Sequence, residues 1–498
     1  MHLRTIGLAA LLAATSLAAN GRAADRANLI GVADTSGCTE DPAASTTVPG
    51  WITSEGSPSL LCRSLAEISA SGAAAIQPDR IASGPYGSSA LERDIAVGAA
   101  AGAIDRGTAT YALSGWLGTS GSGQAGARLT MTFLDAAGRT LRGTAQLEGP
   151  ARVAASSTTP TAGPATAFAA RSAHGAIPRG TRSLRVVLRF VNAGAAHDAA
   201  YAERLRLTLR PALKLPPAPP PASTVPRFDH VFLIMMENTD YEQVIGDAND
   251  APFINQLAHR GTLLARFTGV YHPSDENYLA IAGGDTAVRG AIYFPKIHLA
   301  VRHLGDSIEA AGKTWKAYEQ GMGTPCNTTT QYDKYYEPDD APFVNYTDVI
   351  DNAARCRAHL VDTTQLPADL ATAATTPDFA WIAADDYDDG EDSGNGSPAS
   401  LRVQDDWLRR TLAPLFASPA WRGQRSLLIL TWDESHATRT NHIATILLGS
   451  PGTVRAGHVS QVRYDHYSTG RTIEEALGLP MLTANDRYAR PINDAFVR

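Results

Sequence analysis

The chain has 498 residues and contains 43 Lys and Arg against 50 Asp and Glu, which gives a formal net charge of −7. A chain of this length is long enough for two or more domains. No global positive field is present to attract nucleic acid, so a nucleic-acid partner is not expected.

Residues 1–24 have the pattern of a secretory signal. An apolar stretch, IGLAALLAATSLAA at 6–19, follows a thin positive region and is too short to span a bilayer. Cleavage after Ala19 or Ala23 suits the preference for small residues. No later segment is long and apolar enough to cross a membrane. We therefore expect a secreted or periplasmic protein. The alternative for residues 1–24 is a buried N-terminal helix.

Four cysteines fit an oxidising compartment. Three disulfide pairings are possible, and proximity in the sequence favours Cys38–Cys62 and Cys326–Cys356. No two cysteines have a CxxC spacing, which argues against a thiolate metal site. Free buried thiols are the alternative.

Residues 25–212 alternate short strand-like runs with turns rich in Gly, Ser, Thr and Pro. Runs such as RLTMTFL and RLRLTL have a period close to two. Short strands without helical windows between them predict an all-β sandwich. Residues 213–227 follow as a linker, because six prolines between positions 216 and 226 exclude a helix or a central strand and favour a polyproline spacer.

Residues 228–498 change to alternating strands and helices. Expected strands are HVFLIMM, DFAWIAA, SLLILTW and HIATILLG, and expected helices include residues 251–263, 403–417 and 468–479. The segment 306–318 is expected to run from a helix into a strand. This alternation predicts an α/β domain with a mainly parallel sheet and helices on both faces.

Two of the predicted strands stop abruptly at acidic residues. Glu237 and Asn238 follow VFLIMM, and Asp433 and Glu434 follow LLILTW. Ligands of open α/β sheets bind at the carboxyl ends of strands. Carboxylate and amide oxygens delivered there suit a hard divalent cation, so these four residues are the predicted metal ligands. Sequence leaves open whether the ion is Ca²⁺, Mg²⁺, Mn²⁺ or Zn²⁺.

A hydroxyl and an amide occur in the string YHPSDENYLAIAGG (271–284). Ser274 precedes a helix-like stretch, where free backbone N–H groups favour an anionic phosphate and a nucleophilic serine. Asn277 follows three residues on. A plain helix-capping serine is the alternative for Ser274.

Histidines in two other strings are candidates for catalysis. His442 in NHI and His466 in YDHYS can bind phosphate or protonate a leaving group. His272 and His436 are weaker candidates, and Asp465 is expected to orient His466.

The C-terminal region resembles the phosphoesterase family of bacterial and fungal acid phosphatases and phospholipases C. The matching strings occur in order: MMENTDYEQVIG, APFINQLAHRGT, HPSDENYLAIAGG, APFVNY, DDYDDG, TWDE, NHIATILLG and DHYS–RTIEEALGLP. The resemblance implies an alkaline-phosphatase-like fold, a serine nucleophile at Ser274, and an amide at Asn277 that donates to a phosphoryl oxygen. It also implies a metal at Glu237, Asn238, Asp433 and Glu434. Residues 80–211 resemble galactose-binding-like jelly rolls, which implies a carbohydrate or cell-wall polymer as a partner; a non-binding appendage is the alternative.

This chain departs from the family pattern at two positions. Asp340 and Asp388 stand where relatives commonly have histidines in KHNPF-like and DMHDG strings. Two added carboxylates next to a phosphate are unfavourable unless a cation neutralises them. Asp386, Asp388 and Asp389 are therefore predicted to form a second metal or substrate site. A different ester preference, a loss of activity and a solvated turn are the alternatives.

These observations predict a secreted, metal-dependent phosphoesterase, most simply an acid phosphatase acting on phosphomonoesters. A phospholipase C that cleaves diesters is the first alternative, and a non-catalytic surface protein with a degenerate domain is the second. A sulfatase is not favoured, because HPSDENY lacks the C/S-x-P-x-R string.

Overall fold

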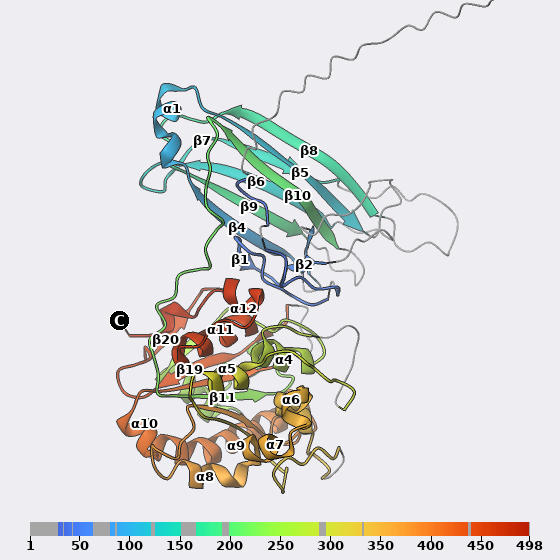
Figure 1. Ribbon diagram of the computed structural model, residues 1–498, viewed down its shortest axis with the longest axis vertical. Helices are drawn as coiled ribbons and strands as arrows, with labels where there is room; N and C mark the ends of the chain where they lie inside the picture. Colours follow the sequence, from blue (N-terminus) through green and yellow to red (C-terminus); the bar gives the residue numbers. More distant parts are fainter. Residues whose placement is uncertain are drawn as a thin grey trace, which may run out of the picture.

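A computed structural model describes residues 28–497, apart from residues 33, 42, 63–79, 85–86, 121–124, 151–165, 192–198, 288–294, 331–332 and 437–439. The predicted signal sequence, 1–24, lies outside the described residues. A β-rich body and an α/β body are joined by residues 211–229, which form no helix or strand (Figure 1). Within the described ranges, no helix combines the length and the apolar character that crossing a bilayer requires.

Two five-stranded antiparallel sheets form the N-terminal body, in the orders β1-β4-β9-β6-β7 and β2-β3-β10-β5-β8. Their strands are β1 (Ile52–Glu55), β2 (Ser59–Leu61), β3 (Arg80–Ala82), β4 (Ser89–Ala96), β5 (Thr110–Ser120), β6 (Gly126–Leu134), β7 (Thr140–Glu148), β8 (Thr166–Ala176), β9 (Ser183–Val191) and β10 (Ala200–Arg210). The short helices η1 (Gly98–Ala100) and α1 (Ala101–Arg106) connect β4 to β5.

Alternating side chains explain why these segments form a sandwich. In β9, Leu184, Val186, Leu188 and Phe190 are fully buried, and the residues between them are partly or fully exposed. A strand with this period buries one face against the core. The all-β prediction for this region is therefore confirmed, while the jelly-roll type stays a prediction.

An eight-stranded sheet in the order β15-β14-β16-β11-β17-β19-β12-β20 forms the centre of the C-terminal body. A small sheet, β18-β13-β21, lies beside it. The strands are β11 (His230–Met236), β12 (Thr262–Leu264), β13 (Phe267–Thr268), β14 (Trp315–Glu319), β15 (Leu360–Asp362), β16 (Phe379–Ala383), β17 (Ser426–Trp432), β18 (His442–Ile443), β19 (Thr445–Gly449), β20 (His458–Ser460) and β21 (Tyr464–Asp465).

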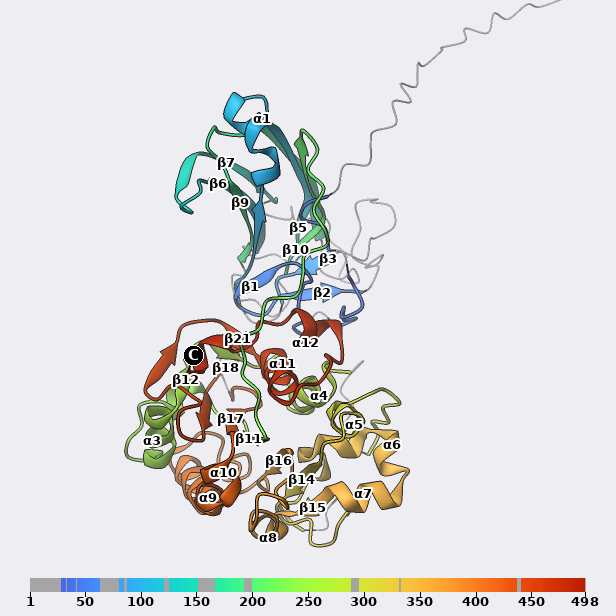
Figure 2. The same ribbon diagram turned by 60° about the vertical axis from the view of Figure 1, so that its left-hand side comes forward.

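Helices cover both faces of this sheet, with α4 and α11 on one side and α9 and α10 on the other (Figures 1 and 2). The helices are α2 (Tyr241–Val244), α3 (Pro252–Arg260), α4 (Asp275–Gly283), α5 (Leu304–Ala310), α6 (Thr347–Ile350), α7 (Ala353–His359), α8 (Leu366–Asp369), α9 (Pro398–Ala417), α10 (Pro419–Gly423), α11 (His466–Leu477) and α12 (Ala484–Tyr488). Short 3-10 turns are η2 (Pro338–Asp340), η3 (Pro342–Asn345), η4 (Thr363–Gln365) and η5 (Asn493–Ala495).

The sheet is mainly parallel, as the sequence predicts. β15, β14, β16, β11 and β17 pair in parallel, whereas β19 pairs antiparallel with both β17 and β12. All seven residues of β11 and of β17 are buried, which explains their continuous apolar runs. The predicted strand HIATILLG is instead divided, because β18 joins the small sheet and β19 joins the large one.

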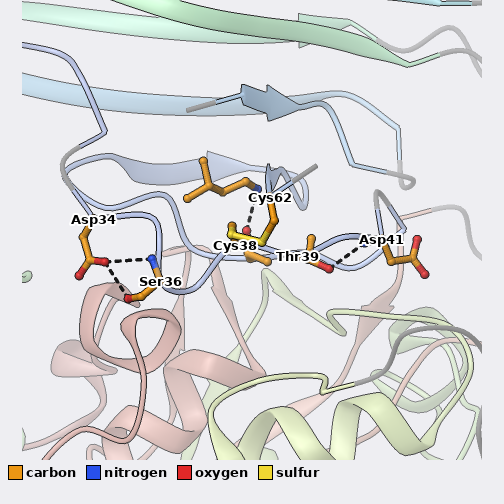
Figure 3. The surroundings of a disulfide bond; sticks show 8 residues. Asp34, Ser36, Cys38, Thr39, Asp41 and Cys62 are labelled. Atoms are coloured by element: carbon orange, nitrogen blue, oxygen red, sulfur yellow. Dashed lines mark hydrogen bonds between the residues drawn. A yellow bond between two sulfur atoms is a disulfide. The ribbon is translucent and has the colours of Figure 1, made fainter. Parts of the chain in front are cut away.

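Both predicted disulfides, Cys38–Cys62 and Cys326–Cys356, are present. Figure 3 shows the first, in a segment that lies between the two bodies. We call residues 38–62 the stapled segment. Its residues Trp51 and Leu60 belong to the core of the N-terminal body.

Candidate active site

Acidic residues follow neighbouring parallel strands at one edge of the large sheet. The register of β11 and β17 places Met236 beside Trp432, so the next residues, Glu237 and Asp433, leave the sheet side by side. Glu319 is the last residue of β14, two strands away from β11. This carboxyl edge is where open α/β sheets bind their ligands.

Ser274 precedes the first residue of α4 and contacts this edge. Its hydroxyl donates to Oε2 of Glu237 over 3.0 Å. Tyr278, one turn further along the helix, donates to Oε1 of the same carboxylate over 2.5 Å. The positive end of a helix favours both a bound anion and a nucleophilic oxygen. The serine therefore has the surroundings expected of a nucleophile.

Asn277 braces the loop that carries this serine. The backbone N–H groups of Val270 and Tyr271 donate to its Oδ1 over 2.9 and 3.1 Å. Its Nδ2 donates to the carbonyl oxygens of Tyr271 and Pro273 over 3.2 and 3.3 Å. The amide of Asn277 therefore holds the 270–274 loop in shape, and its contact with a phosphoryl oxygen stays a prediction.

Asn238 ties the ends of β11 and β17 together. Its backbone N–H donates to Oδ1 of Asp433 over 3.0 Å, and its φ of 34° lies in the left-handed region that asparagine tolerates. Its side-chain Nδ2 lies 3.4 Å from Oε1 of Glu391. Glu434 points to a different neighbour and pairs with Nδ1 of His272. Burial lowers the pKa of His272 and raises that of Glu434, so this contact joins two uncharged groups at neutral pH.

Three carboxylates from the loops beyond the strands converge on one point. Asp340, Asp386 and Asp389 each offer an oxygen, and these oxygens all lie within 4.8 Å of one another. Asp388 is not part of this group, although the sequence suggested it. Its carboxylate accepts a hydrogen bond from Nε2 of Gln320 over 2.8 Å.

The carboxylates of this site share one electrostatic environment. Burial raises the pKa of Glu237 well above its usual value, and the charge of Asp433 raises it further, followed by smaller contributions from other nearby carboxylates. Burial also raises the pKa of Asp386 to about 8 and that of Glu434 to about 9. So many carboxylates in one buried region favour protonation or a bound cation.

Whether a divalent cation fits this site can be judged from its buried oxygens that have no hydrogen-bond partner. Among the described residues, these include Oδ2 of Asp433, Oδ2 of Asp340 and both carboxylate oxygens of Glu319. Glu319 is 1% exposed, so water does not solvate it. Hard oxygen donors of net negative charge are the ligand set of Ca²⁺, Mg²⁺ or Mn²⁺, so the residues present fit a divalent cation.

A second acidic cluster is already neutralised by the protein itself. His303, Asp306 and Asp348 also bring ligand atoms within 4.8 Å of one another. Arg355, however, forms ion pairs with both Asp306 and Asp348. The fixed guanidinium provides the charge that a cation would bring, so this cluster is structural.

The ring of His442 contacts groups other than the carboxylate cluster, and its catalytic role stays a prediction. Its Nδ1 lies 2.8 Å from Oε1 of Glu242, and its Nε2 lies 3.1 Å from the carbonyl oxygen of Ala265. Its ring stacks on Tyr241. One ring nitrogen therefore contacts α2, and the other contacts the turn between β12 and β13.

His466 is buried directly behind the site. Its Nε2 lies 2.6 Å from the carbonyl oxygen of Asp433, and burial lowers its pKa to about 4. The neutral ring therefore donates to that carbonyl and supports the end of β17. Asp465 does not orient it as predicted, since its carboxylate caps α11 by accepting from the backbone N–H of Ser468.

His272 is the histidine that the structure brings next to the serine loop. It directly precedes Pro273 and Ser274, and its ring pairs with Glu434. The sequence favours His442 and His466 over it, because a lone histidine is usually structural and those two stand in matching motifs. Glu319 was missed, although it follows a strand-like run in the same way that Glu237 does.

The α/β fold therefore places a serine beside a cluster of buried carboxylates whose oxygens could hold a cation. The model of the Phosphoesterase family matches residues 247–480. A phosphatidylinositol-3-phosphatase of Mycobacterium tuberculosis is 30% identical over 274 residues, covering 55% of this chain and 84% of that protein. An acid phosphatase of Aspergillus fumigatus is 29% identical over 265 residues, covering 51% of this chain and 56% of that protein.

Among solved structures, a protein in the alkaline phosphatase superfamily from Vibrio parahaemolyticus aligns with a TM-score of 0.41 and 11% identity, over 54% of this chain and 71% of that one. The chain belongs to the phosphoesterase family, and it is a hydrolase that acts on phosphoric ester bonds.

Proposed function

We propose that the chain hydrolyses phosphomonoesters through Ser274, in the manner of an acid phosphatase. The observation that carries this proposal is the hydrogen bond from the Ser274 hydroxyl to the buried carboxylate of Glu237. A serine whose proton already points at a carboxylate is oriented for attack. The names of the relatives support a monoester, since both describe phosphatases.

In the proposed reaction, Oγ of Ser274 forms a bond to phosphorus while the bond from phosphorus to the leaving oxygen breaks. Glu237 accepts the serine proton, and His272 is placed by its pairing with Glu434 to deliver a proton to the leaving oxygen. Water then hydrolyses the phosphoserine and regenerates the hydroxyl. The α4 N-terminus stabilises the anionic phosphate through its free backbone N–H groups.

We propose that the reaction requires one or more divalent cations. Two groups of residues would hold them. Glu237, Asn238 and Asp433 form one group at the strand ends, and Asp340, Asp386 and Asp389 form the other. When bound, the cation supplies positive charge for the phosphoryl oxygens and lowers the pKa of a coordinated hydroxyl or water. The unpartnered buried carboxylate oxygens support this requirement.

The test is hydrolysis of p-nitrophenyl phosphate and of p-nitrophenyl phosphorylcholine by the purified protein. Each is measured with Ca²⁺, Mg²⁺, Mn²⁺ or Zn²⁺ and with a chelator. Faster turnover of the monoester supports the phosphatase, and faster turnover of the diester supports a phospholipase C. No turnover with any ion contradicts the proposed function and favours a degenerate domain.

We also propose that the protein is exported and that its β-sandwich holds a carbohydrate or cell-wall polymer. Two disulfides support an oxidising compartment. A hollow on the sandwich is lined by Tyr111, His174 and Arg210, an aromatic and polar set that suits a sugar ring. Retention of the full chain on insoluble polysaccharides, and its loss in Tyr111→Ala, would support this role; no retention on any polysaccharide would contradict it.

A further inference from the structure

The stapled segment of the N-terminal body contacts the loop that carries the proposed nucleophile. The hydroxyl of Tyr271 donates to Oδ2 of Asp41 over 2.6 Å. The backbone N–H of Ser45 donates to the carbonyl oxygen of Val270 over 2.8 Å. Both contacts join residues more than two hundred positions apart, and they reach the loop three and four residues before Ser274.

The contact of Ser45 with Val270 is buried, and the contact of Asp41 with Tyr271 is partly buried. Val270 is fully buried, Ser45 is 1% exposed and Tyr271 is 8% exposed. The carbonyl oxygen of Ser45 also accepts from the hydroxyl of Tyr467 over 3.2 Å. Buried hydrogen bonds of this kind exclude water and hold their partners in one arrangement.

The stapled segment is itself held firmly at its two ends. The disulfide joins Cys38 to Cys62, and the backbone N–H groups of Thr39 and Cys62 form hydrogen bonds across the segment to Leu60 and Thr39 (Figure 3). Asp41 is fixed in turn, because its Oδ1 accepts from the backbone N–H of Ala43 over 2.8 Å. Because the stapled segment is rigid, its contacts can hold the 270–274 loop in one position.

The loop between these contacts and the nucleophile has little freedom of its own. Asn277 ties Val270, Tyr271 and Pro273 to α4, and Nδ2 of Asn441 donates to the carbonyl oxygen of Tyr271 over 2.9 Å. A displacement of Tyr271 is therefore passed on to His272, Pro273 and Ser274. A shift of about 1 Å at reacting groups is enough to cost on the order of 100-fold in rate.

We propose that Asp41 is a positioning residue for catalysis, and that the N-terminal body completes the active site by holding the 270–274 loop through the stapled segment. This proposal rests on the proposed role of Ser274. In this proposal the β-sandwich contributes to turnover, whether or not it also binds a polymer.

The test compares Asp41→Ala and Tyr271→Phe with Thr47→Ala in the full chain. Thr47 is the matched control, because it lies in the same segment and its hydroxyl contacts Ala484 and Asn485 on α12 without touching the loop. We expect Asp41→Ala and Tyr271→Phe each to lower kcat about tenfold with little change in KM, and the double variant to be no slower than either. Asp41→Asn keeps an acceptor oxygen and is expected to restore most of the rate, while Thr47→Ala keeps the wild-type kcat.

A second readout separates this proposal from the proposed function. Amide hydrogen exchange of residues 270–277 is expected to be faster in Asp41→Ala and unchanged in Thr47→Ala, whether or not a substrate is turned over. Unchanged exchange and unchanged kcat in Asp41→Ala would overturn the positioning role. Equal losses in Asp41→Ala and Thr47→Ala would also overturn it, because the effect would then follow general interface stability. Absence of turnover in the wild-type chain would instead overturn the proposed function and leave the exchange comparison decisive.

Discussion

Ser274, the residue before α4, and Tyr278, one turn further along that helix, donate hydrogen bonds to the two oxygens of the same buried carboxylate, that of Glu237. Residues four apart lie on one face of a helix, which explains how a single helix contacts both oxygens. Glu237 is thereby held in a fixed orientation toward the serine.

Tyr278→Phe removes one of these two bonds while preserving the ring. We expect a stability loss of about 1–3 kcal/mol, because a buried acceptor is left unsatisfied. We also expect slower turnover with a nearly unchanged KM, since Glu237 can then rotate away from Ser274. Thermal unfolding and steady-state kinetics check both effects; wild-type kcat in this variant would show that Glu237 needs no such support.

Removal of divalent cations is expected to destabilise the protein more at pH 8 than at pH 5. Burial raises the folded-state pKa of Asp386 to about 8, above the unfolded value of about 3.9. A group with a raised folded pKa contributes stability below its unfolded pKa, and this contribution is lost as the pH rises toward the folded pKa. A bound cation neutralises the carboxylates that protons neutralise at lower pH. The rise in Tm on adding the cation should therefore be larger at pH 8 than at pH 5.

Asp340 and Asp388 provide a matched pair for this measurement. Asp340→Asn removes a charge from the convergent cluster, so it should reduce the cation-induced rise in Tm. Asp388→Asn changes a residue bonded to Gln320 and should leave that rise intact. The same response in both variants would contradict a cation at the cluster.

Replacing His272 and His442 in turn tests which of the two histidines takes part in catalysis. We expect His272→Ala to lower kcat at least tenfold, because its ring pairs with Glu434 beside the serine loop. His442→Ala should keep most of the activity, because both ring nitrogens of His442 contact Glu242 and Ala265 and not the carboxylate cluster. The reverse order of rates would restore the role that the sequence suggested.

Asp378 is expected to stabilise the opposite end of the sheet in a pH-dependent way. Burial alone would raise its pKa, but hydrogen bonds from Lys313 and Thr314 outweigh burial and hold the pKa below its usual value. This contribution is present above the unfolded pKa and is lost as the pH falls through the folded pKa. Asp378→Asn should cost about 1–2 kcal/mol at pH 7 and less below about pH 4, with unchanged activity; denaturant unfolding across pH checks this, and an equal cost at all pH values would contradict it.

Sequence could predict the parts of the site that depend on local pattern. Glu237 and Asp433 follow apolar strands, and the parallel register brings them together as expected. His442 has a similar local signal, yet its position depends on how β18 pairs with β13, a contact that no local pattern encodes.

The other parts of the site depend on long-range contacts, which local sequence patterns do not reveal. Asp340 joins Asp386 and Asp389 because η2 folds back onto the loop after β16. Asp41 reaches Tyr271 only because the stapled segment packs between the two bodies. Both relationships require the tertiary structure, since the residues involved are distant in sequence and carry no motif.

The most direct test of the account is the metal-dependent hydrolysis of p-nitrophenyl phosphate by the wild-type chain and by Ser274→Ala. The account predicts turnover that a chelator abolishes, and a loss of at least about 1,000-fold in the variant with a nearly unchanged Tm, because the substitution removes the nucleophile and one hydrogen bond. Ser36→Ala, which changes an exposed serine in the N-terminal body, serves as the control and should retain full activity. Wild-type turnover by Ser274→Ala would contradict the central claim.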